Sequence, residues 1–200
     1  MAAGSGVVHQ EMPRGDRAGR LAGVQLWTNL PARLKMRPPR YIEIVSEEIP
    51  AVELPGGGSL LVISGQFGNA QGPLPDLMTT PTFFDVTLTP GAVLSVPVTE
   101  GHTILVYVLS GDLLPAPGHA AVMARQTAIY EREGDTLALA AGEDGAQVLV
   151  IGGEPLGEPV VRQGPIVTNT AEELDTALRE LQEGTFIKDY AAVTRNSGMD

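Results

Sequence analysis

Short apolar segments separated by glycine and proline recur through the middle of this chain of 200 residues. Phe84, Val86 and Leu88 alternate with polar residues, the period-two pattern of a strand with one buried face. Many short strands at such spacing are typical of an antiparallel sandwich or barrel. We therefore predict an all-β fold. The expected strands are residues 41–49, 59–64, 84–88, 93–98, 103–109, 121–130, 136–140 and 147–151.

The stretch at residues 147–170 ends this series of strands. Its run Val148–Ile151 is short and β-branched and stops at two glycines, as a buried strand does. Pro155 and Pro159 each remove a backbone donor, so the residues around them are not regular structure. We predict a strand, a stiff turn and a crossover that leads into a helix.

That helix is predicted over residues 170–184. Thr170 as N-cap and Glu173 three residues later form the capping-box pattern, and Gly184 is a fitting C-terminal stop. A single apolar stripe at helical spacing predicts packing against the sheets. Its members are Leu174, Ala177, Leu178 and Leu181.

Several of these segments resemble a known family. The strings Ile151-Gly-Gly-Glu-Pro-Leu-Gly-Glu-Pro-Val-Val161 and Gly164-Pro-Ile-Val-Thr-Asn-Thr170 closely resemble the signature of the pirins, which are two-cupin proteins. The resemblance continues in Gly23–Pro31, Met36–Tyr41 and His9–Pro13. It covers most of the chain and implies a cupin fold, a double-stranded β-helix or jelly-roll barrel.

The resemblance also implies a domain organisation in three parts. Residues 1–45 would be a remnant of the N-terminal cupin with a linker, residues 46–165 the C-terminal cupin, and residues 166–200 a segment carrying the helix. In pirins a His-x-His motif lies about forty residues before the His-x-Glu motif of the first cupin. We therefore expect the N-terminal barrel to be truncated. The sequence leaves open whether the chain is a fragment, has a misplaced start or is naturally short.

His9 and Glu11 are the candidate metal ligands. If residues 8–12 form a strand, residues two apart face the same side, so the two side chains lie together. An imidazole and a carboxylate can bind iron, manganese, copper or zinc. On spacing alone, two polar side chains near a terminus are the simpler interpretation. The resemblance assigns them as two of four ligands of a divalent metal, with iron as the first choice.

The C-terminal cupin is expected to be free of metal, as in the family. The turn at Pro90-Gly91 leads to one histidine, His102, with Ile104 where a second would fall. The hairpin expected at residues 135–147 carries no histidine. We interpret His102 as a turn histidine and His119 as exposed in a loop.

Two segments nearer the N-terminus carry further predictions. Residues 24–29 alternate like a strand, and Trp27, the single tryptophan, is expected to pack in a core or between domains. The connector at residues 34–41 carries the one concentrated group of basic residues, which we interpret as a solvated linker that pairs with the acidic body and not as an anion site. These residues are Arg33, Lys35, Arg37 and Arg40.

Charge and composition exclude several classes of function. The chain has 13 basic and 24 acidic residues, a net charge of −11, which repels nucleic acid and anionic lipid. It has no cysteine, hence no disulfide and no cysteine-bound zinc. No apolar stretch is long enough to span a membrane, and the first twenty residues lack the pattern of a signal peptide. We predict a cytoplasmic protein.

Three functions are compatible with the resemblance. The first is a metal-dependent dioxygenase of the quercetinase type that acts on a flavonol-like molecule, impaired here because the His-x-His half of the site is missing. The alternative is a non-enzymatic regulatory module that binds a protein partner, such as a transcription regulator or a metabolic enzyme. The third is a structural remnant that self-associates through exposed strand edges. The sequence assigns no catalytic residue.

Overall fold

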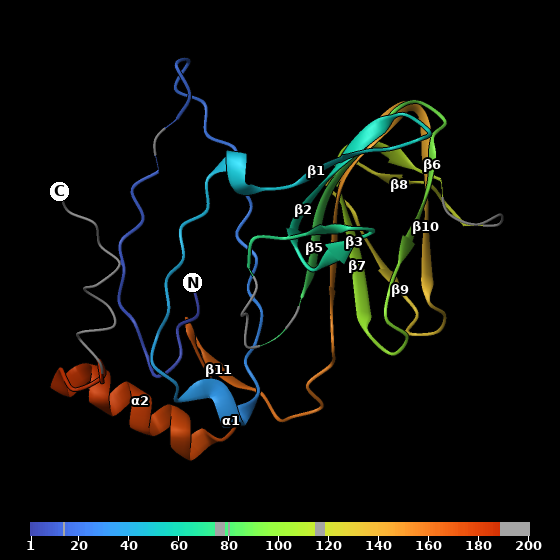
Figure 1. Cartoon of the computed structure of the whole chain (residues 1–200). Coiled ribbons are helices and arrows are strands. Elements are labelled where there is room, and N and C mark those ends of the chain that lie inside the picture. Colours follow the sequence, from blue (N-terminus) through green and yellow to red (C-terminus); the bar gives the residue numbers. More distant parts are fainter. Residues whose placement is uncertain (14, 75–78, 80, 115–118, 189–200) are drawn as a thin grey trace. The chain divides into compact units, whose positions relative to one another are not determined.

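The structure is a computed structural model that describes residues 1–13, 15–74, 79, 81–114 and 119–188. The chain divides into two compact units (Figure 1). Ile44–Pro155 form the barrel unit, and Met1–Glu43 together with Leu156–Asp200 form the terminal unit. The division into 1–45, 46–165 and 166–200 stays a prediction, and residues 189–200 of its last part lie outside the described residues.

The barrel unit is built on one eight-stranded sheet in which every pairing is antiparallel. Its main path runs β1-β2-β5-β10-β7-β8, while β6 pairs with β10 and β9 pairs with β7. The strands are β1 (Ala51–Glu53), β2 (Gly58–Ser64), β5 (Thr82–Leu88), β6 (Val93–Pro97), β7 (Thr103–Leu113), β8 (Val122–Met123), β9 (Thr127–Tyr130) and β10 (Thr136–Gly153). A separate hairpin of β3 (Gln66–Phe67) and β4 (Ala70–Gln71) and a 3-10 turn at Ser46–Glu48 complete the unit.

The core follows the predicted alternation. Along β5, Phe84 and Val86 are buried while Thr87 between Val86 and Leu88 is exposed. Phe84 also meets the ring of Phe67 edge-on, with centroids 6.1 Å apart. The other large and fully buried side chains belong to the same hydrophobic cluster as Phe84. They are Leu60, Val62, Val86, Val96, Val106, Val108, Leu139, Val148 and Val150.

The structure differs from the predicted strands in the middle of β10. We expected two strands, 136–140 and 147–151, joined by a hairpin at residues 135–147, but they form one strand of 18 residues. The glycine-rich and acidic residues between them form an irregularity, where the register against β7 shifts between Ala141 and Ala146. Gly145 has φ 76°, which lets the strand bend without ending.

Among the other strand predictions, four are confirmed and two are wrong, and each error lies at a turn. The strands expected at 59–64, 84–88, 93–98 and 103–109 are present. The single strand expected at 121–130 is two, β8 and β9, because Arg125 takes a positive φ of 70° between them. The strand expected at 41–49 is wrong, since a 3-10 turn occupies Ser46–Glu48 and the strand begins at Ala51.

The terminal unit contains α1 (Ala32–Lys35), β11 (Val161–Gln163), β12 (Ile166–Thr168) and α2 (Ala171–Glu183). The predicted helix is confirmed as α2. The hydroxyl of Thr170 accepts a hydrogen bond from the N–H of Glu173, the Glu173 carboxylate accepts one from the N–H of Thr170, and Gly184 ends the helix at φ 73°. β11 and β12 form the hairpin that leads into it.

The strands expected at residues 8–12 and 24–29 are wrong. Neither segment pairs with another strand in the described part of the chain, and without a ladder neighbour an extended segment is not a strand. The expected core packing of Trp27 is also wrong. Its side chain is 54% exposed, with the guanidinium carbon of Arg162 5.4 Å from the ring centroid.

Candidate metal centre

His9 and Glu11 lie side by side in the terminal unit. Nδ1 of His9 is 3.8 Å from Oε1 of Glu11, and the side chains are 41% and 63% exposed. No strand forms over residues 8–12 in the described structure. His9 and Glu11 therefore lie together, as the His-x-Glu spacing predicts, although the strand that we expected to align them is not formed.

The pair fits two positions around a divalent metal. Two donors each about 2.1 Å from one ion lie about 3.0–3.4 Å apart at angles between 90° and 109°. The separation of 3.8 Å is only slightly wider, and both side chains are exposed enough to close it by rotation. Gln25 adds an amide that donates a 3.4 Å hydrogen bond to Oε1 of Glu11. Among the described residues no group of three or more His, Cys, Asp or Glu side chains gathers to hold a metal.

The glutamate of the second Gly-Glu-Pro repeat, Glu158, joins distant parts of the terminal unit. Its Oε2 accepts hydrogen bonds from the backbone N–H of Ala32 at 2.7 Å and from Nδ2 of Asn169 at 3.1 Å. Nδ2 of Asn169 also donates to the carbonyl of Pro159 at 2.9 Å. Asn169 is buried, and its Oδ1 has no hydrogen-bond partner in the described structure. Sequence reasoning missed this network, although both residues stand inside the pirin-like strings.

Arg33, Arg37 and Arg40 are exposed, as the interpretation of the basic segment as a solvated linker expects, and only the partly buried Lys35 departs from it. Lys35 lies in α1, and its Nζ donates a 2.5 Å hydrogen bond to Oδ1 of Asn29. Partial burial lowers the pKa of Lys35, while the charges of Glu158 and Glu173 act in the opposite direction. The segment is thus part of the folded unit, with the neighbouring Leu34 buried.

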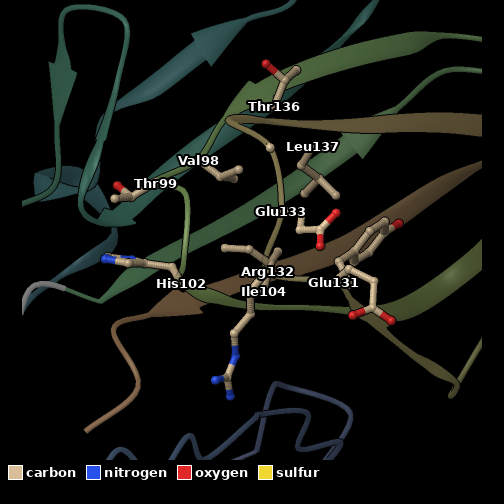
Figure 2. A pocket seen from close by; sticks show the side chains of 11 residues that line it. Val98, Thr99, His102, Ile104, Glu131, Arg132, Glu133, Thr136 and Leu137 are labelled. Atoms are coloured by element: carbon tan, nitrogen blue, oxygen red, sulfur yellow. The ribbon is translucent and has the colours of Figure 1, made fainter. Parts of the chain in front are cut away.

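The barrel unit has a pocket of about 250 Å³ at one end of its strands (Figure 2). Two turns form it, held together by hydrogen bonds from the N–H of Val98 to the carbonyl of Asp135 and from the N–H of Gly101 to the carbonyl of Arg132, each 2.9 Å. The lining mixes an apolar floor with charged side chains at the rim. These residues are Val98, Thr99, His102, Ile104, Tyr130, Glu131, Arg132, Glu133, Gly134, Thr136 and Leu137.

The histidines of this unit lie where the sequence predicts them. The N–H of His102 donates to the carbonyl of Thr99 at 3.1 Å, which makes it a turn residue at the pocket rim, and His119 is exposed. Burial raises the pKa of Tyr130, which lines the same pocket. Figure 2 shows Glu131 and Glu133 on the far side of the pocket from His102. The expected metal-free state of this cupin stays a prediction.

Comparison with known proteins decides the family. The model of the pirin C-terminal cupin domain matches residues 83–187, more than half of the chain. The chain belongs to the pirin family. Human pirin is 38% identical over 187 residues, which are 91% of this chain and 62% of that protein. A relative from Pseudomonas aeruginosa, named provisionally as a quercetin 2,3-dioxygenase, is 41% identical over 194 residues, 94% of this chain and 66% of its own length. The chain thus spans about two thirds of the length of these pirin relatives.

A solved structure confirms the fold. The crystal structure of quercetin 2,3-dioxygenase from Acinetobacter baumannii superposes with a TM-score of 0.75 at 35% identity, covering 80% of this chain and 55% of the other. The predicted all-β cupin with a C-terminal helix is therefore confirmed. In the described part of the chain, no helix is both long enough and apolar enough to cross a membrane.

Proposed function

We propose that this pirin-family chain contributes His9 and Glu11 to the metal centre of a quercetinase-type dioxygenase. The observation that carries the proposal is the 3.8 Å approach of the His9 imidazole to the Glu11 carboxylate. The similarity to a solved quercetin 2,3-dioxygenase supports the reaction class. A flavonol-like molecule is the proposed substrate and the cytoplasm the proposed location.

The roles of the chain's own residues follow from their chemistry. His9 and Glu11 would each supply one donor to a divalent metal, with iron as the first choice. The bound metal would supply Lewis acidity toward oxygen atoms of the substrate. The carboxylate of Glu11 can also accept a proton from a hydroxyl group, and the Gln25 amide holds its Oε1 at 3.4 Å. Because the described residues provide no third carboxylate or imidazole, we expect weak metal retention and impaired turnover.

Metal binding by the purified chain tests this proposal. Titration with Fe²⁺ under anaerobic conditions, read by calorimetry, should show weak binding with one ion per chain. His9→Ala and Glu11→Ala should each abolish it. His119→Ala is the matched control, since that histidine is exposed and outside the pair. Binding that survives both His9→Ala and Glu11→Ala would refute the assignment.

The second candidate function is a regulatory module that binds a protein. The observation that favours it is the strongly acidic character of the chain, with a net charge of −11, which suits a basic partner surface. Catalytic turnover of a flavonol distinguishes the dioxygenase from the regulatory module. Oxygen consumption with a flavonol in the presence of Fe²⁺ supports the enzyme, whereas its absence in a chain that binds Fe²⁺ through His9 and Glu11 favours the module.

A further inference from the structure

The amide of Gln25 approaches the two candidate metal ligands from a separate segment of the chain. Its Nε2 lies 3.4 Å from Oε1 of Glu11, the same oxygen that lies 3.8 Å from Nδ1 of His9. All three residues are exposed, so their side chains have room to reorient around an ion. An imidazole, a carboxylate and an amide therefore gather around one carboxylate oxygen.

A turn held by hydrogen bonds explains why Gln25 meets Glu11. The N–H of Asp16 donates to the carbonyl of Arg20 at 2.8 Å, and the guanidinium of Arg20 lies 2.9 Å from the Asp16 carboxylate. The N–H of Ala18 donates to the same carboxylate at 2.8 Å. Glu11 stands five positions before Asp16, and Gln25 stands five positions after Arg20. The two residues are therefore equally far from the turn along the chain, and the chain reversal brings them together.

The separation between the amide and the carboxylate suits two ligands of one ion. Hydrogen bonds from N–H to oxygen usually measure about 2.7–3.2 Å, so the bond from Gln25 to Glu11 is a long one at 3.4 Å. Two donors bound to one divalent ion lie about 3.0–3.4 Å apart. The oxygen and nitrogen of an amide exchange places by a half-turn of its terminal torsion, which is soft. That half-turn presents Oε1 of Gln25 where Nε2 now lies.

We propose that Gln25 is a third ligand of the metal centre and binds the ion through its amide oxygen. The inference rests on the proposed function, because it adds a donor to the site that contains His9 and Glu11. Without metal, the amide donates to Glu11, and with metal it turns its oxygen to the ion. Carboxylate and amide oxygens suit Mn²⁺ and imidazole suits Fe²⁺, so this donor set favours these two ions. Water and substrate oxygens take the remaining positions.

Binding of Mn²⁺ tests the assignment in the full 200-residue chain. The loss of the electron paramagnetic resonance signal of hydrated Mn²⁺ measures how much ion is bound. Gln25→Leu should weaken binding by roughly tenfold or more, since even an outer group at a metal site is commonly worth about 10–100-fold in affinity. Gln163→Leu is the matched control, because Gln163 is an exposed glutamine of β11 in the same unit. Its affinity for Mn²⁺ should equal that of the unchanged chain.

Gln25→Glu distinguishes a ligand from a group that only positions Glu11. A carboxylate at this position is a stronger ligand than an amide, so Mn²⁺ binding should tighten. A residue whose one role is to donate a hydrogen bond to Glu11 gives the opposite result, because glutamate removes the donor and repels Glu11. Equal or weaker binding by Gln25→Glu would overturn the proposal.

A further variant tests how Gln25 reaches the ion. Asp16→Ala removes the acceptor that holds the turn and changes none of the three ligands, and it should weaken Mn²⁺ binding. In the Gln25→Leu background the same change should have no further effect, because the donor that the turn delivers is already absent. Circular dichroism of each variant checks that these changes at exposed positions leave the fold intact.

The outcomes separate this inference from the proposed function. Binding that is lost in His9→Ala and Glu11→Ala but unchanged in Gln25→Leu would overturn the role of Gln25 and leave the proposed function standing. An unchanged chain that binds neither Mn²⁺ nor Fe²⁺ would overturn both. Equal losses from Asp16→Ala with and without Gln25→Leu would also contradict delivery of the amide by the turn.

Discussion

The carboxylate of Glu158 accepts a 2.7 Å hydrogen bond from the backbone N–H of Ala32, across 126 positions of sequence. This bond satisfies a donor in the first turn of α1, where Pro31 provides no side-chain cap. The same carboxylate oxygen binds the buried amide of Asn169. One glutamate thereby fixes the entry into α1 and the approach to α2 in the terminal unit.

Replacing Glu158 should destabilise the terminal unit. Glu158→Ala leaves the Ala32 N–H without its acceptor and Nδ2 of Asn169 with only the Pro159 carbonyl, so we expect a loss of about 1–3 kcal/mol in the free energy of unfolding. Fluorescence of Trp27, the single tryptophan, reports urea unfolding of this unit. Glu154→Ala is the matched control from the first Gly-Glu-Pro repeat, since Glu154 is exposed and makes no such bonds. Equal losses in both variants would contradict this role.

Substituting Asn169 by aspartate should make stability depend on pH. Asn169→Asp replaces a donor with a second carboxylate about 3 Å from Glu158. The two negative charges raise the pKa of the pair in the folded state. The folded variant therefore takes up a proton at higher pH than the unfolded one, and its stability rises as pH falls from about 7 to about 5. Urea midpoints at several pH values measure this.

Asn29→Asp is the contrasting variant for that experiment. Oδ1 of Asn29 accepts a hydrogen bond from Nζ of Lys35, so a carboxylate there gains an opposite charge. We expect its midpoint at neutral pH to match or exceed that of the unchanged chain. A midpoint for Asn169→Asp that does not respond to pH would contradict the close contact with Glu158.

The sequence predicts local features of this chain well. The strands at 59–64, 84–88, 93–98 and 103–109 follow from alternation and turn residues, and α2 follows from its capping box and final glycine. These signals lie within a few residues of one another, so the local pattern suffices. The pairing of His9 with Glu11 is of the same kind, since the two residues are only two positions apart.

Features that depend on distant partners were not predictable from local pattern. Residues 24–29 alternate like a strand and residues 8–12 were expected to form one, but both lack a ladder neighbour in the described part of the chain. The bond from Ala32 to Glu158 joins two positions that no periodicity relates. The acidic glycine-rich residues 142–145 have the composition of a turn, yet pairing of β10 with β7 on both sides of them carries the strand through.

Gly111 should not tolerate a side chain. Its φ is 71°, and a Cβ there would meet the carbonyl oxygen of Gly145, where β7 and β10 approach at the irregularity. Gly101→Ala is the matched control, because φ is 84° and nothing lies within 4 Å of its Cβ position. Both variants carry the left-handed backbone penalty of about 1 kcal/mol. Gly111→Ala should lose about 1–3 kcal/mol more in the free energy of unfolding. Similar thermal shifts would show that the strands relax at this point.

Tyr130 should reveal its burial through titration at alkaline pH. Burial raises the pKa of its phenol above the usual value of 10.0 in the folded state. Below that value both states are protonated, and stability is unaffected. As pH rises through it, the unfolded chain loses the proton while the folded chain keeps it, so the free energy of unfolding falls. Tyr130→Phe removes this decline. The difference in ultraviolet absorbance between the unchanged protein and Tyr130→Phe isolates the ionisation of this phenol. We expect the phenol to ionise at a higher pH in the folded protein than in urea. Titration curves that coincide in the two conditions would show that Tyr130 is freely hydrated.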